Sequence, residues 1–105
     1  MSEQAVLIHI PLSNGEFGTD EEQEAVFALE EELSEAVEGS GLGEFDGNEF
    51  GGGECVFYIY GASADALYAV VEPILRTRPI AARGFAIRRY GEAGDPHAAE
   101  ARATW

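Results

Sequence analysis

The sequence predicts one two-layer α+β domain over residues 1–105, with the element order β-α-β-β-α-β. Two segments repeat apolar residues at the three- and four-residue spacing of an amphipathic helix. Other runs are rich in β-branched and aromatic residues and alternate as strands do. Between the two helical segments, residues 43–61 have the composition of a β-hairpin.

The first third of the chain predicts a strand followed by a long helix. Residues 5–10 read Ala-Val-Leu-Ile-His-Ile, and Pro11 closes them because it cannot donate to a continuing strand ladder. Thr19 and Glu22 have the spacing of a capping box, so we expect a helix to begin there. The Gly-Ser-Gly sequence at 39–41 is expected to end this helix.

The hairpin is the stretch around which the rest of the chain is organised. A polar arm leads into three glycines, 51–53, and returns as Glu54–Tyr60, the most apolar and aromatic run of the protein. Strand-forming residues bounded by glycine on both sides predict an interior strand of the sheet.

The second half predicts another helix and strand. Ser63 is placed to cap a helix that begins at about Ala64, and Pro73 predicts a kink or a separate final turn. Residues 83–90 alternate as a strand, whereas 91–105 read either as a turn with a short edge strand or as a frayed tail. This order of elements is typical of the ferredoxin-like sandwich, in which both helices cover one face of an antiparallel sheet.

The other face of that sheet is the first candidate site. Alternation along the strands places a mixed set on it: His9, Tyr58, Tyr60, Arg88 and Tyr90. Such a face is either an ordinary solvated surface or a contact surface, since Tyr and Arg are enriched among interface anchors. We favour a contact surface, self-association included, because the same face also holds Leu7 and Val56.

The edge of the hairpin is the second candidate site. Asp46, Asn48 and Glu49 lie beside the three glycines, where backbone groups of an edge strand stay unpaired. The competing interpretation, which we weight somewhat more, is that Gly47 marks a β-bulge and the acids discourage edge pairing.

The charge distribution bears on the partners. Residues 1–75 contain 17 acidic and no basic residues, whereas 76–105 contain six arginines and three acids, for a net charge of −14. This field disfavours nucleic acid and anionic membranes and would attract a basic protein partner. We give more weight to the interpretation that the acids only maintain the solubility of a small domain, and adaptation to salt also stays open.

No catalytic, metal or cofactor site is predicted, so an enzyme is the less favoured class. The glycines at 51–53 lack the Lys-Ser/Thr of a phosphate loop, and neither histidine pairs with Cys55 at zinc spacing. We expect Cys55 to be a buried, inert thiol. With one cysteine and no signal-like segment, we expect a cytoplasmic protein.

Several short motifs resemble a group of small bacterial proteins. They read Glu-Phe-Asp-Gly at 44–47 with Glu49 and further glycines, Tyr-x-Tyr-Gly at 58–61 and Ala-Asp-x-Leu at 64–67. The resemblance covers roughly residues 43–90; it implies a ferredoxin-like fold and assigns no catalytic residue. The leading hypothesis is a non-enzymatic acidic interaction module that self-associates or binds a basic protein partner, through the open sheet face or through the acidic first helix. The alternative is a small-molecule-binding protein or small enzyme that uses the open sheet face.

Overall fold

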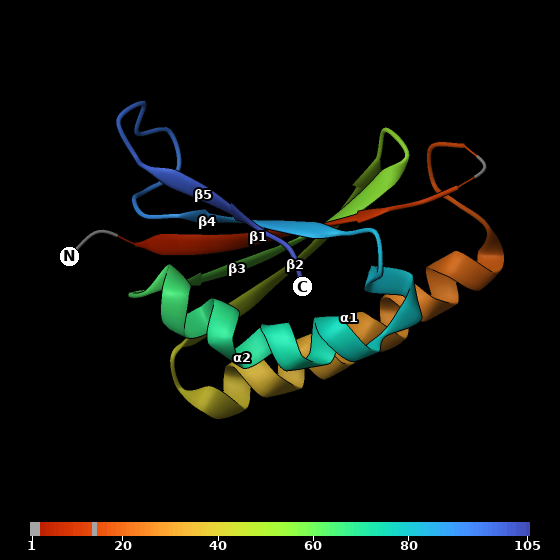
Figure 1. The fold of residues 1–105 in the computed structure, drawn as a ribbon, viewed down its shortest axis with the longest axis horizontal. Coiled ribbons are helices and arrows are strands. Elements are labelled where there is room, and N and C mark those ends of the chain that lie inside the picture. Colours follow the sequence, from red (N-terminus) through yellow and green to blue (C-terminus); the bar gives the residue numbers. More distant parts are fainter. Residues whose placement is uncertain (1–2, 14) are drawn as a thin grey trace.

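The computed structural model describes residues 3–13 and 15–105. Its elements follow the predicted order (Figure 1). They are β1 (Gln4–Pro11), α1 (Asp20–Ser40), β2 (Gly43–Gly51), β3 (Glu54–Gly61), α2 (Ala64–Thr77), the 3-10 turn η1 (Pro79–Ala81), β4 (Phe85–Arg89) and β5 (Glu100–Ala103).

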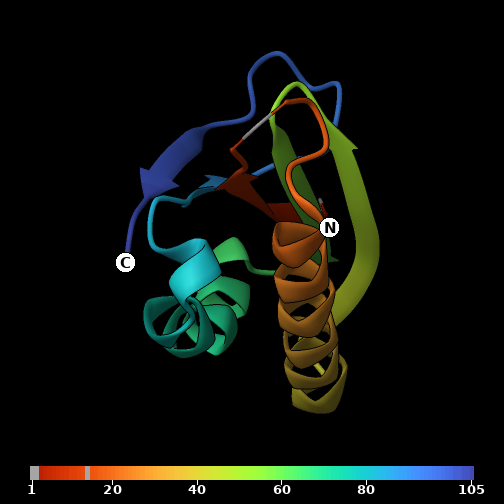
Figure 2. The same ribbon diagram turned by 90° about the vertical axis from the view of Figure 1, so that its right-hand side faces the viewer.

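The strands form one antiparallel sheet in the order β2-β3-β1-β4-β5. Both helices lie on the same side of it, which confirms an α+β architecture in two layers (Figures 1 and 2). The C-terminal segment forms the short edge strand β5, paired with β4, and is not a frayed tail. Among the described residues, no helix is both long and apolar enough to cross a membrane.

Local signals in the sequence account for both helices. The Thr19 side chain accepts a hydrogen bond from the Glu22 backbone N–H at 3.1 Å, and the Glu22 carboxylate accepts one from the Thr19 N–H at 2.9 Å. The bond from the Thr19 N–H to the carboxylate, followed by that from the Ser13 N–H, lowers the pKa of Glu22. Ser63 caps α2, which continues through Pro73 to Thr77 without the predicted separate turn at that proline.

The core fills the space between the sheet and the two helices. Alternate residues of β1 and β3 are completely buried in it, together with Ala86 of β4: Val6, Ile8, Ile10, Cys55, Phe57 and Ile59. The buried helix residues are Val26, Leu29, Leu33 and Val37 of α1 and Ala64, Leu67, Val71 and Leu75 of α2. Burial raises the pKa of Cys55 to about 12, so its thiol stays protonated at neutral pH.

The hairpin has the predicted turn and a bulge. Gly52 and Gly53 turn the chain with positive φ angles of 61° and 81°, which glycine adopts without strain. The register between β2 and β3 shifts between Phe45 and Gly47, and Gly47 has a φ of 125°. The interpretation of Gly47 as a β-bulge is therefore confirmed.

Candidate functional site

The sheet face that no helix covers, called the open face below, carries three rows of side chains. Directly paired residues of antiparallel strands share a face, so the register defines each row. The middle row is Gly47, Tyr58, Leu7, Ile87 and Arg102. On one side of it lie Glu49, Val56, His9 and Phe85, and on the other Glu44, Tyr60, Ala5, Arg89 and Glu100.

Side-chain contacts connect four strands across this face. The His9 and Phe85 rings are stacked, with centroids 4.5 Å apart and planes 6° from parallel. The Arg102 guanidinium lies 3.9 Å from the Phe85 centroid, at cation–π distance. His9 Nδ1 lies 3.0 Å from the Glu54 carboxylate. These contacts order the four side chains within the free chain.

The two tyrosines of β3 supply aromatic surface with polar tips. Tyr58 and Tyr60 are half-buried. Desolvation raises the pKa of both phenols, with Glu49 as the next cause for Tyr58 and Asp46 for Tyr60. Both therefore remain protonated, and able to donate hydrogen bonds, well above neutral pH.

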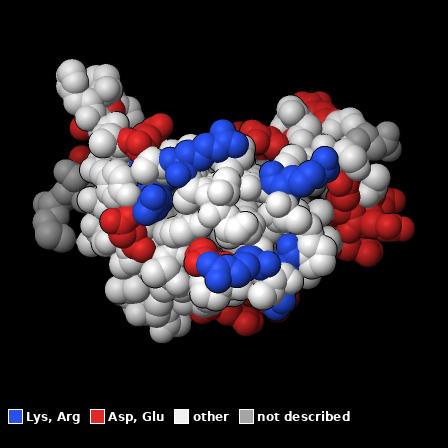
Figure 3. Space-filling view, viewed as in Figure 1, with Lys and Arg blue, Asp and Glu red and all other residues white. Residues whose placement is uncertain are grey.

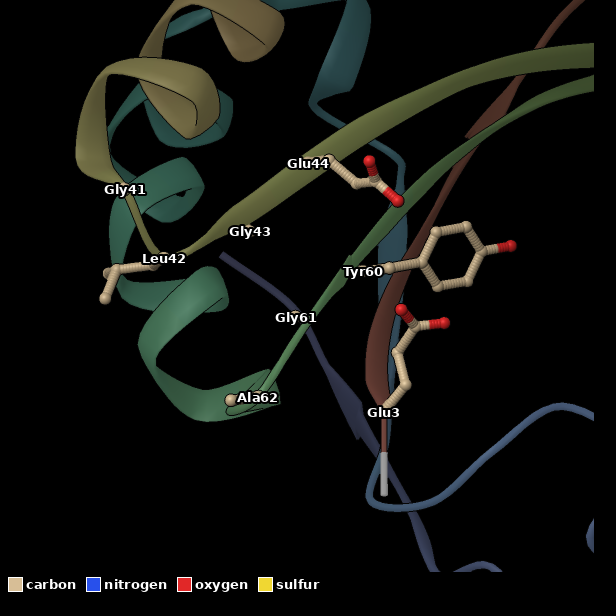
Figure 4. A pocket seen from close by; sticks show the side chains of 8 residues that line it. All are labelled: Glu3, Gly41, Leu42, Gly43, Glu44, Tyr60, Gly61 and Ala62. Carbon is tan, nitrogen blue, oxygen red and sulfur yellow. The ribbon is translucent and has the colours of Figure 1, made fainter. Parts of the chain in front are cut away.

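Tyr60 also borders an open hollow of about 440 Å³ at the end of the hairpin that lies away from its glycine turn. Figure 4 shows its ring between the carboxylates of Glu3 and Glu44, with the backbone of Gly41–Gly43 forming the opposite wall. The hollow offers acidic and aromatic lining and no nucleophile or basic side chain. We assign it no chemistry of its own.

The placement of Arg88 and Tyr90 on the open face was wrong. Val6 and Ile8 point into the core, and their partners on β4 are Arg88 and Ala86, so Arg88 lies on the helix side. Because Phe85 and Ile87 are apolar, the sequence suggested that these two residues point toward the helices and that Arg88 lies on the open face. The structure instead buries the small Ala86 beneath the helices and leaves the larger pair on the open face.

On the helix side, Arg88 and Tyr90 form a polar cluster with the first turn of α2. Asp65 Oδ1 accepts hydrogen bonds from Arg88 Nη1 at 3.0 Å and from the Tyr90 hydroxyl at 2.7 Å. The Arg88 guanidinium also lies 5.4 Å from the Tyr68 ring centroid. The bond to Asp65, followed by desolvation, raises the pKa of Tyr90. This cluster attaches β4 to α2, so we treat it as structural.

Four open-face residues were missed by the sequence reasoning: Phe85, Ile87, Arg89 and Arg102. For Arg102, the signal that could have found it is the Glu-Ala-Arg-Ala alternation at 100–103, which fits a strand with one charged face. The other three residues belong to β4, whose sequence favoured the opposite face assignment. His9, Tyr58 and Tyr60 are brought together as predicted.

The hairpin-edge residues separate from one another. Asp46 and Glu49 are exposed. Asn48, in contrast, lies on the helix side, where its Nδ2 donates to the Glu30 carboxylate of α1 at 2.7 Å. The three residues therefore do not form one binding cluster, and the position of Asn48 is explained by its contact with α1.

Charge is divided across the open face. Its β2–β3 side carries Glu44, Glu49 and Glu54, and its β4–β5 side carries Arg89 and Arg102 with Glu100. Figure 3 shows arginines spread over the side of the molecule formed by β4, β5 and α2, with a larger group of acids at the right-hand end, where α1 begins. Within the described ranges, neither Arg89 nor Arg102 has a carboxylate within ion-pair distance.

No group of three metal-ligating side chains is found among residues 3–13 and 15–105. Comparisons with protein-family models, curated proteins and solved structures give no match.

Proposed function

We propose that the chain is a non-enzymatic protein-interaction module of the cytoplasm whose contact surface is the open face. The observation that supports this most is the middle row, in which Tyr58, Leu7 and Ile87 form a continuous apolar strip over the three interior strands. Charged residues flank the strip on both sides. An apolar, aromatic centre with a polar rim is the usual anatomy of a protein interface.

The contacts within the face support the same proposal. Ordering long side chains at an interface costs conformational entropy. The stack of His9 on Phe85, with Arg102 over the same ring, meets part of this cost already in the free protein. A surface arranged in this way suits a partner with an extended, fairly flat face of its own.

The small-molecule alternative is less well supported by the geometry. It required His9, Tyr58, Tyr60 and Arg88 to converge on one pocket. Arg88 lies on the helix side of the sheet and binds Asp65, so the four side chains do not converge.

We also propose that the fold is ferredoxin-like. In the sheet, β3 lies between β1 and β2 while β4 pairs with the other side of β1, and both helices cover one face. That is the arrangement expected for a β-α-β-β-α-β chain of this type, with β5 as an added edge strand. Membership of the bacterial group whose motifs the hairpin resembles stays a prediction.

In-cell photo-cross-linking tests the proposed function. A benzophenone amino acid replaces Tyr58 on the open face or, as a control, Phe27 on α1, whose side chain is 50% exposed. We expect position 58 to give a cross-linked product of one defined mass and position 27 to give none. The product should disappear when Leu7→Arg is added, because a charge in the apolar strip opposes close contact.

Two results contradict the proposal. One is the absence of any defined product at position 58 in cells that accumulate the folded protein. The other is an identical product pattern at positions 58 and 27, which would show that contact does not select the open face. Circular dichroism of the purified variants establishes that each one is folded.

A further inference from the structure

We propose that the occupant of the open face is the open face of a second copy of this chain, in an orientation set by charge. The inference rests on the proposed function and narrows it to one partner and one geometry. Two identical faces pack through a two-fold axis that lies in the plane between the two sheets. The question is how that axis is oriented relative to the strands.

An axis parallel to the strands reverses the strand order between the copies. Because β1 is the middle strand of β2-β3-β1-β4-β5, it then faces β1 of the second copy, while β3 faces β4 and β2 faces β5. An axis perpendicular to the strands places every strand over its own counterpart. In that case the acidic β2–β3 side meets itself, and like charges in contact are strongly unfavourable.

The parallel axis brings opposite charges together. At the level of the middle row, Arg102 of one copy faces Gly47 of the other, beside Glu49. Gly47 leaves room there, because a Cβ atom built on it would have no heavy atom within 4 Å. An arginine without a carboxylate partner in the free chain thus gains one from the second copy.

The neighbouring rows are also complementary in this orientation. Arg89 faces the Tyr60 ring of the second copy, an arrangement that suits a cation–π contact. Leu7 meets Leu7 near the axis, and Tyr58 meets Ile87 on either side of it. Among the carboxylates and arginines of the three rows, only Glu100 and Glu44 form a like-charged pair, and both are exposed at the periphery of the face. His9, which lies beside Glu54 of its own chain, meets His9 of the second copy near the axis.

The area of the face is adequate for a dimer. Five strands about 4.8 Å apart make it roughly 24 Å wide, and five residues of a strand cover about 17 Å. The projected area is therefore roughly 400 Å², and the accessible area is larger because side chains project from it. A standard interface buries about 800 Å² of accessible surface on each partner, which is of the same order. Aligned packing of two sheets is a common solution for faces of this kind.

Charge reversal with light scattering tests both the partner and the orientation. Arg102→Glu places acid over acid, and Glu49→Arg places arginine over arginine. We expect each variant alone to dimerise at least about tenfold more weakly than the wild type. An equimolar mixture of the two should recover the dimer, because both contacts in the mixed pair then join opposite charges. The double variant in one chain should recover it as well.

Three results overturn the inference. A wild-type chain that stays monomeric at millimolar concentration excludes the second copy as the occupant. A wild-type dimer that neither reversal weakens, or a mixture that recovers nothing, excludes this orientation. The proposed function has a separate outcome, since cross-linking at position 58 to a protein of different mass supports it while it excludes the second copy. Thermal unfolding of each variant shows that the reversal has not unfolded the monomer.

Discussion

On β1 and β3, the side chains that point toward the helices are completely buried, whereas most of their immediate neighbours on the open face keep part of their surface in water. Phe57 and Tyr58 illustrate the contrast, since they are adjacent aromatic residues of one strand. Phe57 packs in the core beside Phe45, with ring centroids 5.8 Å apart, and Tyr58 lies half-exposed in the apolar strip. The same backbone thus presents a core on one side and the partly exposed open face on the other.

This difference means that stability and interaction are separable by mutation. A helix-side change alters the folded monomer, because its surroundings are close-packed. If the open face is the contact surface that we propose, an open-face change alters what the monomer can contact while leaving the core intact. Adjacent residues of one strand therefore serve as matched pairs for experiments.

The largest effect is expected for the aromatic pair. Phe57→Ala should lower the free energy of unfolding by about 3–5 kcal/mol, because it leaves a cavity in a fully buried site. Tyr58→Ala should lower it by less than about 1 kcal/mol under dilute conditions, where the chain is monomeric. Urea unfolding followed by circular dichroism measures both values. Equal losses for the two variants would contradict the division between the faces.

The second-largest effect is expected at alkaline pH, where the buried Cys55 thiol on the helix side should lower the free energy of unfolding. The pKa of Cys55 is raised from 9.0 to about 12, so the folded state holds its proton more tightly than the unfolded state. The stabilisation is complete below pH 9 and is lost as pH rises toward about 12, at up to about 1.4 kcal/mol for each pH unit. Urea midpoints measured between pH 8 and 11 should decline, with a shallower slope for Cys55→Val than for the wild type. A slope that is the same for both would show that the thiol is not responsible.

The consecutive arginines of β4 give a smaller and more selective contrast. Arg88→Ala removes the bond to Asp65 and the contact with Tyr68, and should cost about 1 kcal/mol of stability without changing association. Arg89→Ala, on the open face, removes a 2.8 Å hydrogen bond from Arg89 Nε to the Gly91 carbonyl, so it should cost no more than about 1 kcal/mol of stability, and it should weaken association. Urea unfolding and light scattering on the same samples separate the two outcomes. If Arg88→Ala weakened association and Arg89→Ala did not, Arg88 would lie on the open face and Arg89 on the helix side, contrary to the structure.

Much of the fold could be predicted because local signals in the sequence are strong. The capping box at Thr19, the cap at Ser63 and the glycines of the hairpin turn each determine a boundary through hydrogen bonds or backbone angles that few other residues provide. The faces of β1 and β3 were also predictable, since one set of alternate positions is wholly apolar whereas the other includes His9, Tyr58 and Tyr60.

The face assignment of β4 could not be predicted in the same way. It has only five residues, and its helix side carries the small Ala86 and a charged Arg88 that binds Asp65. Either Ala86 and Arg88 or Phe85 and Ile87 could face the helices. Which set does so depends on which residues fit beneath α2, and that is a property of the packed structure. Arg102 was missed for a related reason, because β5 has only four residues and is defined by its pairing with β4.

The solution mass of the wild type and of Tyr58→Glu, measured by light scattering at matched concentrations, tests the central claim that the open face is a contact surface. The chain has a mass of 11.3 kDa. We expect the wild type to approach twice this value with increasing concentration, and Tyr58→Glu to remain at the monomer mass. Phe17→Glu makes the same charge change at a side chain that is 53% exposed outside the sheet, and should behave as the wild type does. A Tyr58→Glu variant that dimerises as strongly as the wild type would contradict the account.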